Sequence, residues 1–484
     1  MTFEIVFVLL SLLGMMAALI ADKMRPGMVL FSVVVLFLCV GILTPKEMLE
    51  GFSNKGMITV ALLFLVSEGI RQSGTLGQVI KKLLPQGKTT VFKAQLRILP
   101  SVAFISAFLN NTPVVVIFAP IIKHWAKSVK LPATKFLIPL SYVTILGGIC
   151  TLIGTSTNLV VHGMILEAGY EGFTMFELGK VGIFIAIAGI IYLFIFSKRL
   201  LPDARPDTAV PDEEVEEGEK LHRVEAVLGA RFPGINKKLS DFNFQRHYGA
   251  EVKEIKTRNG QRYVDHLEDV VLREGDTLVV MADDTFIPTW GESSVFVLLT
   301  NGNDPDTSGK KKRWLALILL VLMIVGATVG ELPATKEMFP DIKLDMFFFV
   351  CITTIIMAWT NIFPARKYTK YISWDILITI ACAFAISKAM VNSGVADCVA
   401  GFIIGLSDDY GPHVLLAILF VITNLFTELI TNNAAAALAF PLALSISAQL
   451  GVSPTPFFVV ICMAASASFS TPIGYQTNLI VQGI

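Results

Sequence analysis

The chain has 484 residues, of which 54% are hydrophobic and only 16% are charged, and its formal net charge is zero. Because this apolar content exceeds the norm for globular proteins, the composition predicts a polytopic membrane protein with the lipid bilayer as a partner. The zero net charge, without a basic block interleaved with aromatic residues, argues against nucleic acid as a partner. The six cysteines show no CxxC or Cys/His spacing, so neither a disulfide framework nor a metal centre is indicated.

Apolar stretches of membrane-helix length follow one another along the chain, and four of them are interrupted by polar residues. The first has no basic residues before its apolar run and none of the features of a cleaved signal peptide, so we expect a membrane helix there. The expected spans of the first half lie near 3–21, 27–43, 57–71, 94–122, 136–165 and 174–197. Those of the second half lie near 313–330, 345–362, 374–390, 395–405, 412–447 and 455–482.

The interruptions form a pattern that the chain contains twice. The first half contains Asn110-Asn111-Thr112-Pro113 and Gly154-Thr155-Ser156-Thr157-Asn158, and the second contains Thr431-Asn432-Asn433-Ala434 and Gly474-Tyr475-Gln476-Thr477-Asn478. Polar backbone and amide groups persist inside a bilayer only where they line a cavity or bind something. Two such breaks in each half are typical of a secondary transporter that binds its substrate near the middle of the membrane.

The first interruption predicts a re-entrant hairpin. The apolar piece after it, residues 114–122, would span only about 14 Å as a helix, half of a roughly 30 Å hydrocarbon core. A hairpin that returns to its own side also keeps the four lysines from Lys123 to Lys135 inside, as the positive-inside rule requires. The same count places the N-terminus outside. It also makes the second hairpin, around Asn432, enter from the opposite face, as an inverted repeat demands.

The two halves align residue by residue at a nearly constant offset. Asn158 corresponds to Asn478 at an offset of 320, while Asn111 corresponds to Asn432 at an offset of 321. The segment from Ser67 to Gly74 also corresponds to the segment from Ser387 to Gly394 at an offset of 320. Three anchors that agree within one residue over more than eighty positions predict an internal repeat. The first half continues into one more helix after its second break, so we expect the second repeat, residues 313–484, to lack its last helix and the natural protein to be longer.

A polar insert, residues 198–312, follows the first membrane repeat, residues 1–197. It opens with a proline-rich acidic linker, and the short strands and turns after it predict a small cytoplasmic α+β domain near 218–290. The expected aromatic strand from Phe244 to Val252 and the later run from Leu272 to Val280 resemble the C-terminal domain of the TrkA and potassium-conductance regulator family. The resemblance implies a module that binds a small-molecule ligand or dimerises. A spacer without a ligand is the alternative.

The membrane part resembles the divalent anion:sodium symporter family of the larger ion-transporter superfamily. That family carries Ser-Asn-Thr at each hairpin tip, and here Asn110-Asn111-Thr112 and Thr431-Asn432-Asn433 occupy the two triplets. Both depart from strict Ser-Asn-Thr, so the dicarboxylate specificity associated with the triplet does not carry over. The resemblance implies a homodimer in the plasma (cell inner) membrane, and members fused to TrkA-type domains are linked with sulfate or related oxyanions.

The residues at the four breaks also suit sodium and an anion on chemical grounds. Helix N-terminal amides attract an anion, while carbonyl, amide and hydroxyl oxygens suit sodium. We expect one sodium site in each half, formed by Asn111, Thr112, Gly154 and Asn158 and by Asn432, Asn433, Gly474 and Asn478. We expect the substrate between them, in contact with Asn110, Thr155, Ser156, Thr157, Thr431, Gln476 and Thr477. An isolated Asn or Thr more often bonds a neighbouring helix, but four clusters in register favour binding.

The sequence thus predicts an all-α polytopic membrane protein with two inverted repeats, re-entrant helical hairpins and broken helices, and a small α+β domain inserted between the repeats. Its expected function is symport of sodium with a small divalent anion, inorganic sulfate in preference to an organic dicarboxylate, by alternating access. Sodium ions are the coupling ions and no cofactor is expected. No nucleophile, base and orienting group converge in the pattern, so an enzyme is not indicated.

Two alternatives stay open. A sodium/proton or metalloid-oxyanion antiporter of the same superfamily would need a titrating membrane carboxylate. The candidates are Glu68, Asp375 and Glu428, and none of them recurs as an acid in the other half. A ligand-gated channel is less favoured, because the sequence has no Thr-Val-Gly-Tyr-Gly filter.

Overall fold

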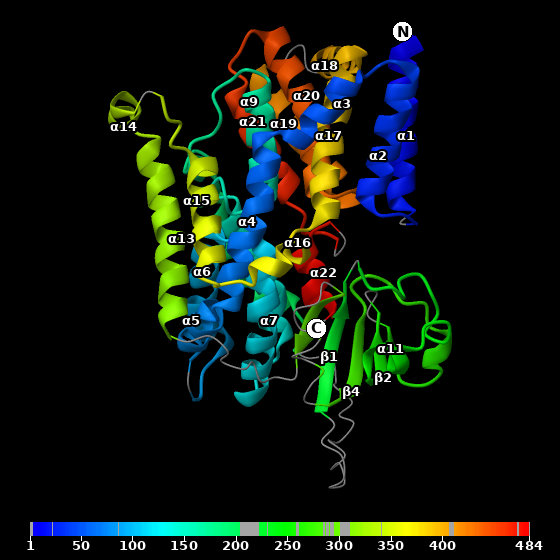
Figure 1. The fold of residues 1–484 in the computed structure, drawn as a ribbon, viewed down its shortest axis with the longest axis vertical. Coiled ribbons are helices and arrows are strands. Elements are labelled where there is room, and N and C mark those ends of the chain that lie inside the picture. The colour runs from blue at the N-terminus through cyan, green and yellow to red at the C-terminus, as the bar shows by residue number, and fades with distance from the viewer. Residues whose placement is uncertain are drawn as a thin grey trace.

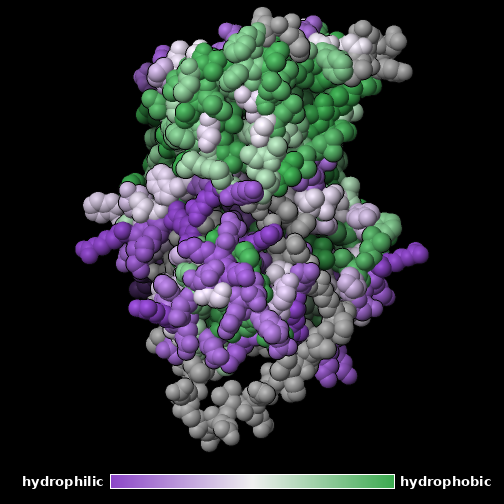
Figure 2. Space-filling model, turned by 90° about the vertical axis from the view of Figure 1, so that its right-hand side faces the viewer, coloured by the Kyte–Doolittle hydropathy of each residue, from purple (hydrophilic) through white to green (hydrophobic). Residues whose placement is uncertain are grey.

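The computed structural model describes a helical body and an inserted domain (Figure 1). The described residues are 3–21, 23–85, 87–203, 222–229, 231–257, 261–283, 286, 290, 295–300, 310–339, 341–405, 411–471 and 474–483. Within these ranges, eight helices are long and apolar enough to cross a membrane, so the chain is a multi-pass membrane protein. Figure 2 shows a mostly apolar surface on the helical body and a hydrophilic one on the insert. The predicted acidic linker lies outside the described residues.

Each predicted apolar stretch contains an observed helix or a pair of helices. The first half consists of α1 (Phe3–Ile20), α2 (Pro26–Val40), α3 (Pro45–Glu50), α4 (Lys55–Gln72), α5 (Thr75–Leu83), α6 (Val91–Phe108), α7 (Asn111–Ser128), α8 (Thr134–Gly148), α9 (Ser156–Glu167) and α10 (Gly179–Leu200). The second consists of α13 (Lys310–Gly330), α14 (Pro333–Met338), α15 (Met346–Trp359), α16 (Tyr368–Tyr371), α17 (Trp374–Asn392), α18 (Val395–Gly405), α19 (Pro412–Leu429), α20 (Asn432–Leu450), α21 (Thr455–Ser466) and α22 (Gln476–Gly483).

Helices of the two halves begin at corresponding positions. Asn111 begins α7 and Asn432, 321 positions later, begins α20; Thr134 and Thr455 begin α8 and α21 at the same offset. Helix α5 was not among the predicted spans, because Lys81 and Lys82 interrupt its apolar pattern, yet α18 begins 320 positions after it. The helix starts therefore agree with the offset found in the sequence. That the two halves form an inverted repeat stays a prediction.

The first polar interruption separates two helices of equal length. Leu109 is extended and Asn110 lies outside both helices, so the chain turns between α6 and α7. Pro113 falls in the first turn of α7, where its missing N–H group is tolerated. The apolar piece 114–122 is only part of α7, which has 18 residues and a length of about 27 Å, so the length argument from that piece alone was wrong. Polar residues such as Lys123 and Lys127 carry the helix further.

The two hairpins lie toward opposite ends of the helical body. Figure 1 shows α7 beside the insert and α20 toward the other end, among α9, α19 and α21. α20 packs against α17, α19 and α21. Residues 434–437, four consecutive alanines at the start of α20, are at most 1% exposed, so neighbouring helices pack closely against this part of α20. Whether either hairpin re-enters its own side of the membrane stays a prediction.

The insert contains one antiparallel five-stranded sheet in the described residues, with the strand order β3-β2-β4-β1-β5. Its strands are β1 (His222–Leu228), β2 (Glu251–Lys256), β3 (Arg262–Tyr263), β4 (Thr277–Ala282) and β5 (Phe296–Thr300). The expected aromatic strand is only partly correct, because its first five residues form the helix α11 (Phe244–Tyr248). Asn243 caps this helix by accepting from Arg246 N–H, and Gly249, with φ of +70°, ends it.

The insert docks directly on helices that begin at the breaks. Lys123 of α7 donates to both carboxylate oxygens of Glu225 in β1, at 2.9 and 3.1 Å, and Lys256 lies 3.4 Å from the same carboxylate. Burial raises the pKa of Glu225, but the two lysines more than offset this effect, and the pKa lies below its ordinary value. On α22, Leu479 packs against Gly275, where a Cβ atom would lie 2.8 Å from the Leu479 side chain.

Candidate functional site

The hairpin of each half contacts the broken helix of the other half. Thr112, in the first turn of α7, donates from Oγ1 to Gln476 Oε1 at 3.1 Å, at the start of α22. In the matching direction, the Ser156 and Thr157 hydroxyls at the start of α9 donate to Asn433 Oδ1 of α20, at 3.2 and 3.3 Å. The starts of four helices, α7, α9, α20 and α22, are thereby brought together.

Tyr475 lies at the centre of this meeting point. Its hydroxyl oxygen accepts a hydrogen bond from Asn111 Nδ2 at 2.6 Å and lies 2.9 Å from Thr155 Oγ1. The side chain of Asn432 also forms a hydrogen bond with Tyr475. The phenol therefore connects both hairpins with Thr155, the residue that precedes α9. Tyr475 itself is buried, with 6% of its surface exposed.

The first break holds a cluster of oxygen atoms around the C-terminal end of α8. Asn158 Nδ2 donates to the carbonyl oxygens of Gly148 and Thr151, at 3.3 and 2.9 Å, and Gly154 N–H donates to Thr151 Oγ1 at 3.2 Å. Asn111 Oδ1 also lies next to Gly148. A Cβ atom added to Gly148 would be only 2.5 Å from this oxygen. Within the described part of the chain, the buried Asn158 Oδ1 has no hydrogen-bond partner.

The second break repeats this arrangement at the end of α21. Asn478 Nδ2 donates to the carbonyl oxygens of Ser468 and Thr471, at 2.9 and 3.3 Å, and Gly474 N–H donates to Thr471 Oγ1 at 3.1 Å. Gly474 leaves room for Ser468, since a Cβ atom on the glycine would lie 1.9 Å from Ser468 Oγ. That buried hydroxyl is also without a partner among the described residues. Asn432 lies nearby, its Oδ1 accepting from Thr427 Oγ1 at 3.4 Å.

One donor distinguishes the two clusters. Ser141 of α8 donates to Asn478 Oδ1 at 2.6 Å and lies 2.9 Å from Thr477 Oγ1, so the amide oxygen in the second cluster is satisfied. The corresponding residue of the second half, 321 positions later, is Cys462, whose thiol is a much weaker donor. The amide oxygen of Asn158 thus remains available for another partner.

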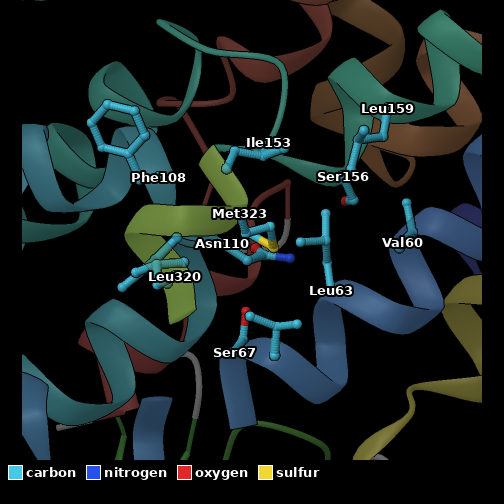
Figure 3. A pocket seen from close by; sticks show the side chains of 12 residues that line it. Val60, Leu63, Ser67, Phe108, Asn110, Ile153, Ser156, Leu159, Leu320 and Met323 are labelled. Atoms are coloured by element: carbon cyan, nitrogen blue, oxygen red, sulfur yellow. The ribbon is translucent and has the colours of Figure 1, made fainter. Parts of the chain in front are cut away.

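A small recess with a cavity volume of about 10 Å³, enough for about one water molecule, lies beside the first hairpin tip (Figure 3). Its polar side chains are Ser67 of α4, Asn110 of the tip and Ser156 of α9, and α13 contributes Leu320 and Met323 to its wall. The remaining lining is apolar, from Val60, Leu63, Val66, Phe108, Leu109, Ile153 and Leu159. The recess marks where Asn110 and Ser156, two residues expected to contact the substrate, face each other across the tip of the first hairpin.

The structure brings together most of the predicted site residues, but in a different grouping. Asn111, Gly154 and Asn158 converge around Gly148, and Gly474 and Asn478 lie beside Ser468. Asn432 bonds Thr427, whose carbonyl oxygen lies next to Gly474. Thr112 and Asn433 do not join these clusters, because their side chains bond residues of the other half. Of the remaining residues, Thr155, Ser156, Thr157, Gln476 and Thr477 lie at the crossing contacts, and the Thr431 hydroxyl is buried without a partner among the described residues.

Five residues of the site were not predicted from the sequence: Tyr475, Ser106, Ser141, Thr427 and Ser468. Three of these could have been found from the repeat register. Tyr475 corresponds to Thr155, and Ser106 to Thr427 at the offset of 321. Both hydroxyls of the latter pair donate to the asparagine that begins the next helix, Ser106 to Asn111 at 2.7 Å and Thr427 to Asn432 at 3.4 Å. Ser141 gave no such signal, because a cysteine occupies its corresponding position.

The three candidate carboxylates all have partners. Glu428 accepts hydrogen bonds from the backbone N–H groups of Ser470 and Thr471, at 3.1 and 3.0 Å, and from Thr471 Oγ1 at 2.7 Å. Glu68 pairs with Arg71 at 2.6 Å, and Asp375 accepts from the Gly27 backbone N–H. Glu428 therefore holds the second break in place. Because all three carboxylates are engaged in these contacts, the structure gives no support to a carboxylate that carries protons across the membrane.

Comparison with known proteins gives one family and several transporters. A family model described as "Citrate transporter" (CitMHS) matches residues 16–439, with a second match over residues 341–484. The chain is 28% identical to uncharacterized transporter sll0640 of Synechocystis sp., over 93% of this chain and 87% of that protein. It is 32% identical to sodium/sulfate cotransporter 1 of Chlamydomonas reinhardtii, over 56% of this chain and 30% of that protein. With the sodium-dependent dicarboxylate transporter SdcS of Staphylococcus saprophyticus it shares 27% identity, over 24% and 22% of the two chains.

Proposed function

The chain belongs to the citrate transporter family, and on this premise we propose that it couples sodium entry to the uptake of a divalent oxyanion, with sulfate as its substrate. A transporter is what the family and the relatives have in common. The sodium coupling, the substrate and the alternating-access mechanism are the parts that we propose. The single observation that carries them is the pair of matching oxygen clusters, one at each break, each with a buried oxygen that lacks a hydrogen-bond partner among the described residues.

Sodium fits these clusters because each offers oxygen atoms at the C-terminal end of a helix. The C-terminal ends of α8 and α21 carry a partial negative charge, and the carbonyl oxygens of Gly148 and Ser468 lie there. A buried oxygen without a partner is unfavourable, by about 1–3 kcal/mol, and a bound cation would remove this penalty. Asn158 Oδ1 would serve in the first cluster and Ser468 Oγ in the second.

The anion fits the other side of each break. The helices α9 and α22 begin there, and their first N–H groups and positive dipole ends favour negative charge. The hydroxyls of Ser156 and Thr157 and the amide of Gln476 lie at these helix starts, and Ser156 also lines the recess together with Asn110. A cation cluster and an anion site therefore share each break, which gives a direct electrostatic coupling between the two solutes.

Sulfate is favoured over a dicarboxylate by the extent of the two similarities. The sodium/sulfate cotransporter matches more than half of this chain, while the dicarboxylate transporter matches about a quarter. Both hairpin triplets also depart from Ser-Asn-Thr. We propose further that the protein works as a homodimer in the plasma membrane, with the N-terminus outside and the insert in the cytoplasm, where the predicted TrkA-like domain would bind a small-molecule ligand.

The test is uptake of labelled anion into proteoliposomes that contain the purified protein. Labelled sulfate and labelled succinate are supplied separately, with an inward sodium gradient or with an equal concentration of potassium. We expect sulfate to accumulate against its gradient only with sodium, and succinate to be taken up much more slowly. Uptake that proceeds equally well in potassium would refute the coupling, and a preference for succinate would refute the substrate.

A further inference from the structure

The contact between Thr155 and Tyr475 marks a difference between the two halves of the candidate site. Each residue directly precedes the helix that follows a break, Thr155 before α9 and Tyr475 before α22, and their positions differ by 320. The first half thus has a short side chain where the second has a phenol. Because the Tyr475 hydroxyl reaches to 2.9 Å from Thr155 Oγ1, the phenol bridges the gap between the starts of these two helices.

The phenol is also held by both hairpins. Asn111, which begins α7, donates to its oxygen at 2.6 Å, and Asn432, which begins α20, forms a further hydrogen bond with it. Tyr475 and Thr155 are 6% and 2% exposed, so the ring lies in packed surroundings. Moving this ring would leave several buried polar groups without partners, and it is therefore a fixed wall of the site.

We propose that Tyr475 determines which anions the site accepts, because its phenol leaves room for a compact tetrahedral oxyanion but not for an extended dicarboxylate. This inference rests on the proposed function, since it assigns a specificity residue to the same anion site. A tetrahedral dianion has its oxygens around one central atom and therefore needs less space at the starts of α9 and α22. A four-carbon dicarboxylate carries its charges at opposite ends of a chain and needs the space that the ring fills.

The hydroxyl adds a hydrogen-bond donor for the anion. Since Asn111 Nδ2 donates to the phenolic oxygen, the proton of Tyr475 is directed to Thr155 Oγ1 or to a bound oxyanion. Hydrogen bonds to charged groups are about twice as strong as neutral ones, so the anion is the better acceptor of the two. The ring and the hydroxyl thus have separate roles, which two substitutions can distinguish.

Tyr475→Phe keeps the ring and removes the hydroxyl, while Tyr475→Thr copies the residue at the corresponding position and removes the ring. Tyr192→Phe, at an exposed position of α10, is the control. Uptake of labelled sulfate and labelled succinate is measured for each full-length variant in proteoliposomes. Thermal stabilisation of the purified proteins by sulfate, malonate and succinate gives a second readout, which does not depend on sodium coupling.

For Tyr475→Phe we expect sulfate affinity to fall by about tenfold while sulfate stays preferred over succinate. For Tyr475→Thr we expect the preference for sulfate over succinate to fall by at least about tenfold in both readouts, and Tyr192→Phe should match the wild type. If Tyr475→Thr does not fold, Tyr475→Leu replaces it, with the same expected direction. An unchanged order of anions in the ring-deleting variant overturns the proposal.

The two readouts keep this inference separate from the proposed function. If the wild type shows no sodium-driven uptake but Tyr475→Thr gains stabilisation by succinate, the proposed coupling is wrong and the specificity role stands. If the wild type takes up sulfate with sodium and Tyr475→Thr keeps the same anion order, the function stands and the role of Tyr475 is wrong.

Discussion

Thr155 Oγ1 lies 2.9 Å from the hydroxyl oxygen of Tyr475, and these two residues occupy corresponding positions in the two halves of the chain. Corresponding residues meet only near an axis that relates the two halves. The reciprocal contacts on either side, from Thr112 to Gln476 and from Ser156 to Asn433, agree with such an axis. The inverted repeat, although still a prediction, accounts for all three contacts at once.

Asn158→Ala should weaken sodium binding in the first cluster. The substitution removes an amide whose oxygen has no protein partner among the described residues and whose nitrogen holds Gly148 and Thr151. We expect the sodium concentration for half-maximal sulfate uptake to rise about tenfold, equivalent to about 1.4 kcal/mol. Asn392→Ala, which removes an amide far along the chain that contacts Ile42 and Glu47, is the matched control. Equal sodium dependence in both variants would exclude Asn158 as a ligand.

Gly474→Ala should disturb the second cluster by crowding. The new Cβ atom would lie 1.9 Å from Ser468 Oγ, so the hydroxyl or the backbone of the break must move. Overpacking of this kind destabilises proteins by about 1–3 kcal/mol, and we expect a lower Tm together with a weaker sodium dependence of uptake. Gly14→Ala on α1, where a Cβ atom meets nothing within 4 Å, should leave both quantities unchanged. A normal Tm for Gly474→Ala would contradict the packing described here.

Glu428→Gln separates symport from the antiporter alternative. The carboxylate accepts three hydrogen bonds from the second break, and a glutamine has only one oxygen to accept them. We expect a loss of about 1.5–3 kcal/mol in stability, seen as a lower Tm, while the remaining uptake still requires sodium. Glu337→Gln, at an exposed position of α14, serves as the control. Uptake that is insensitive to sodium, and that Glu428→Gln abolishes, would instead favour the antiporter.

Lys123→Ala should loosen the insert from α7. The pair with Glu225 is mostly buried, with side chains 33% and 18% exposed, so its loss should destabilise docking by about 1–3 kcal/mol, less than for a fully buried pair. Hydrogen exchange in β1 and α7 should accelerate in Lys123→Ala but not in Lys127→Ala, one helical turn away. The reversed pair Lys123→Glu with Glu225→Lys should recover part of the protection. Unchanged exchange in Lys123→Ala would show that this contact does not hold the domain.

The same contact predicts a pH dependence. The pKa of Glu225 in the folded protein lies below the ordinary value of 4.5, so its ionised form is stabilised by folding. This contribution is fully present above about pH 4.5 and is lost as the pH falls through the lowered pKa. Hydrogen exchange in β1 should therefore be constant between pH 8 and pH 5, after correction for intrinsic exchange rates, and should accelerate only under more acidic conditions. Undocking near neutral pH would contradict the assignment.

The helices and their breaks could be predicted from the sequence, because apolar runs and polar interruptions are local patterns. Each predicted span contains a helix, and the asparagines Asn111 and Asn432 begin α7 and α20 as the offset required. Local patterns failed where a cap decides the structure, as in α11, where Asn243 and Gly249 enclose a short helix in place of the expected strand. The apolar pattern also did not reveal that α7 continues past residue 122 through Lys123 and Lys127.

The grouping of the site residues could not be predicted in the same way. Thr112 and Asn433 belong to the hairpins in sequence, but their side chains face the other half, and only the packing between halves decides this. The role of Tyr475 depends on the same packing, because its partners Asn111 and Thr155 lie more than 300 positions away. The residues of each break were identifiable, while their partners across the interface were not.

The proposed mechanism requires two hairpins that enter the membrane from opposite faces and meet at its middle, so the side on which their outer ends lie can be measured. Single cysteines are placed at Thr90 and Lys130, which flank the first hairpin, and at His413 and Val452, at the ends of the second, in a background without native cysteines. A membrane-impermeant maleimide is applied to right-side-out and to inside-out vesicles. Both positions of the first hairpin should react only from the cytoplasmic side, and both positions of the second only from the outside. Labelling of Thr90→Cys and Lys130→Cys from opposite sides would contradict it.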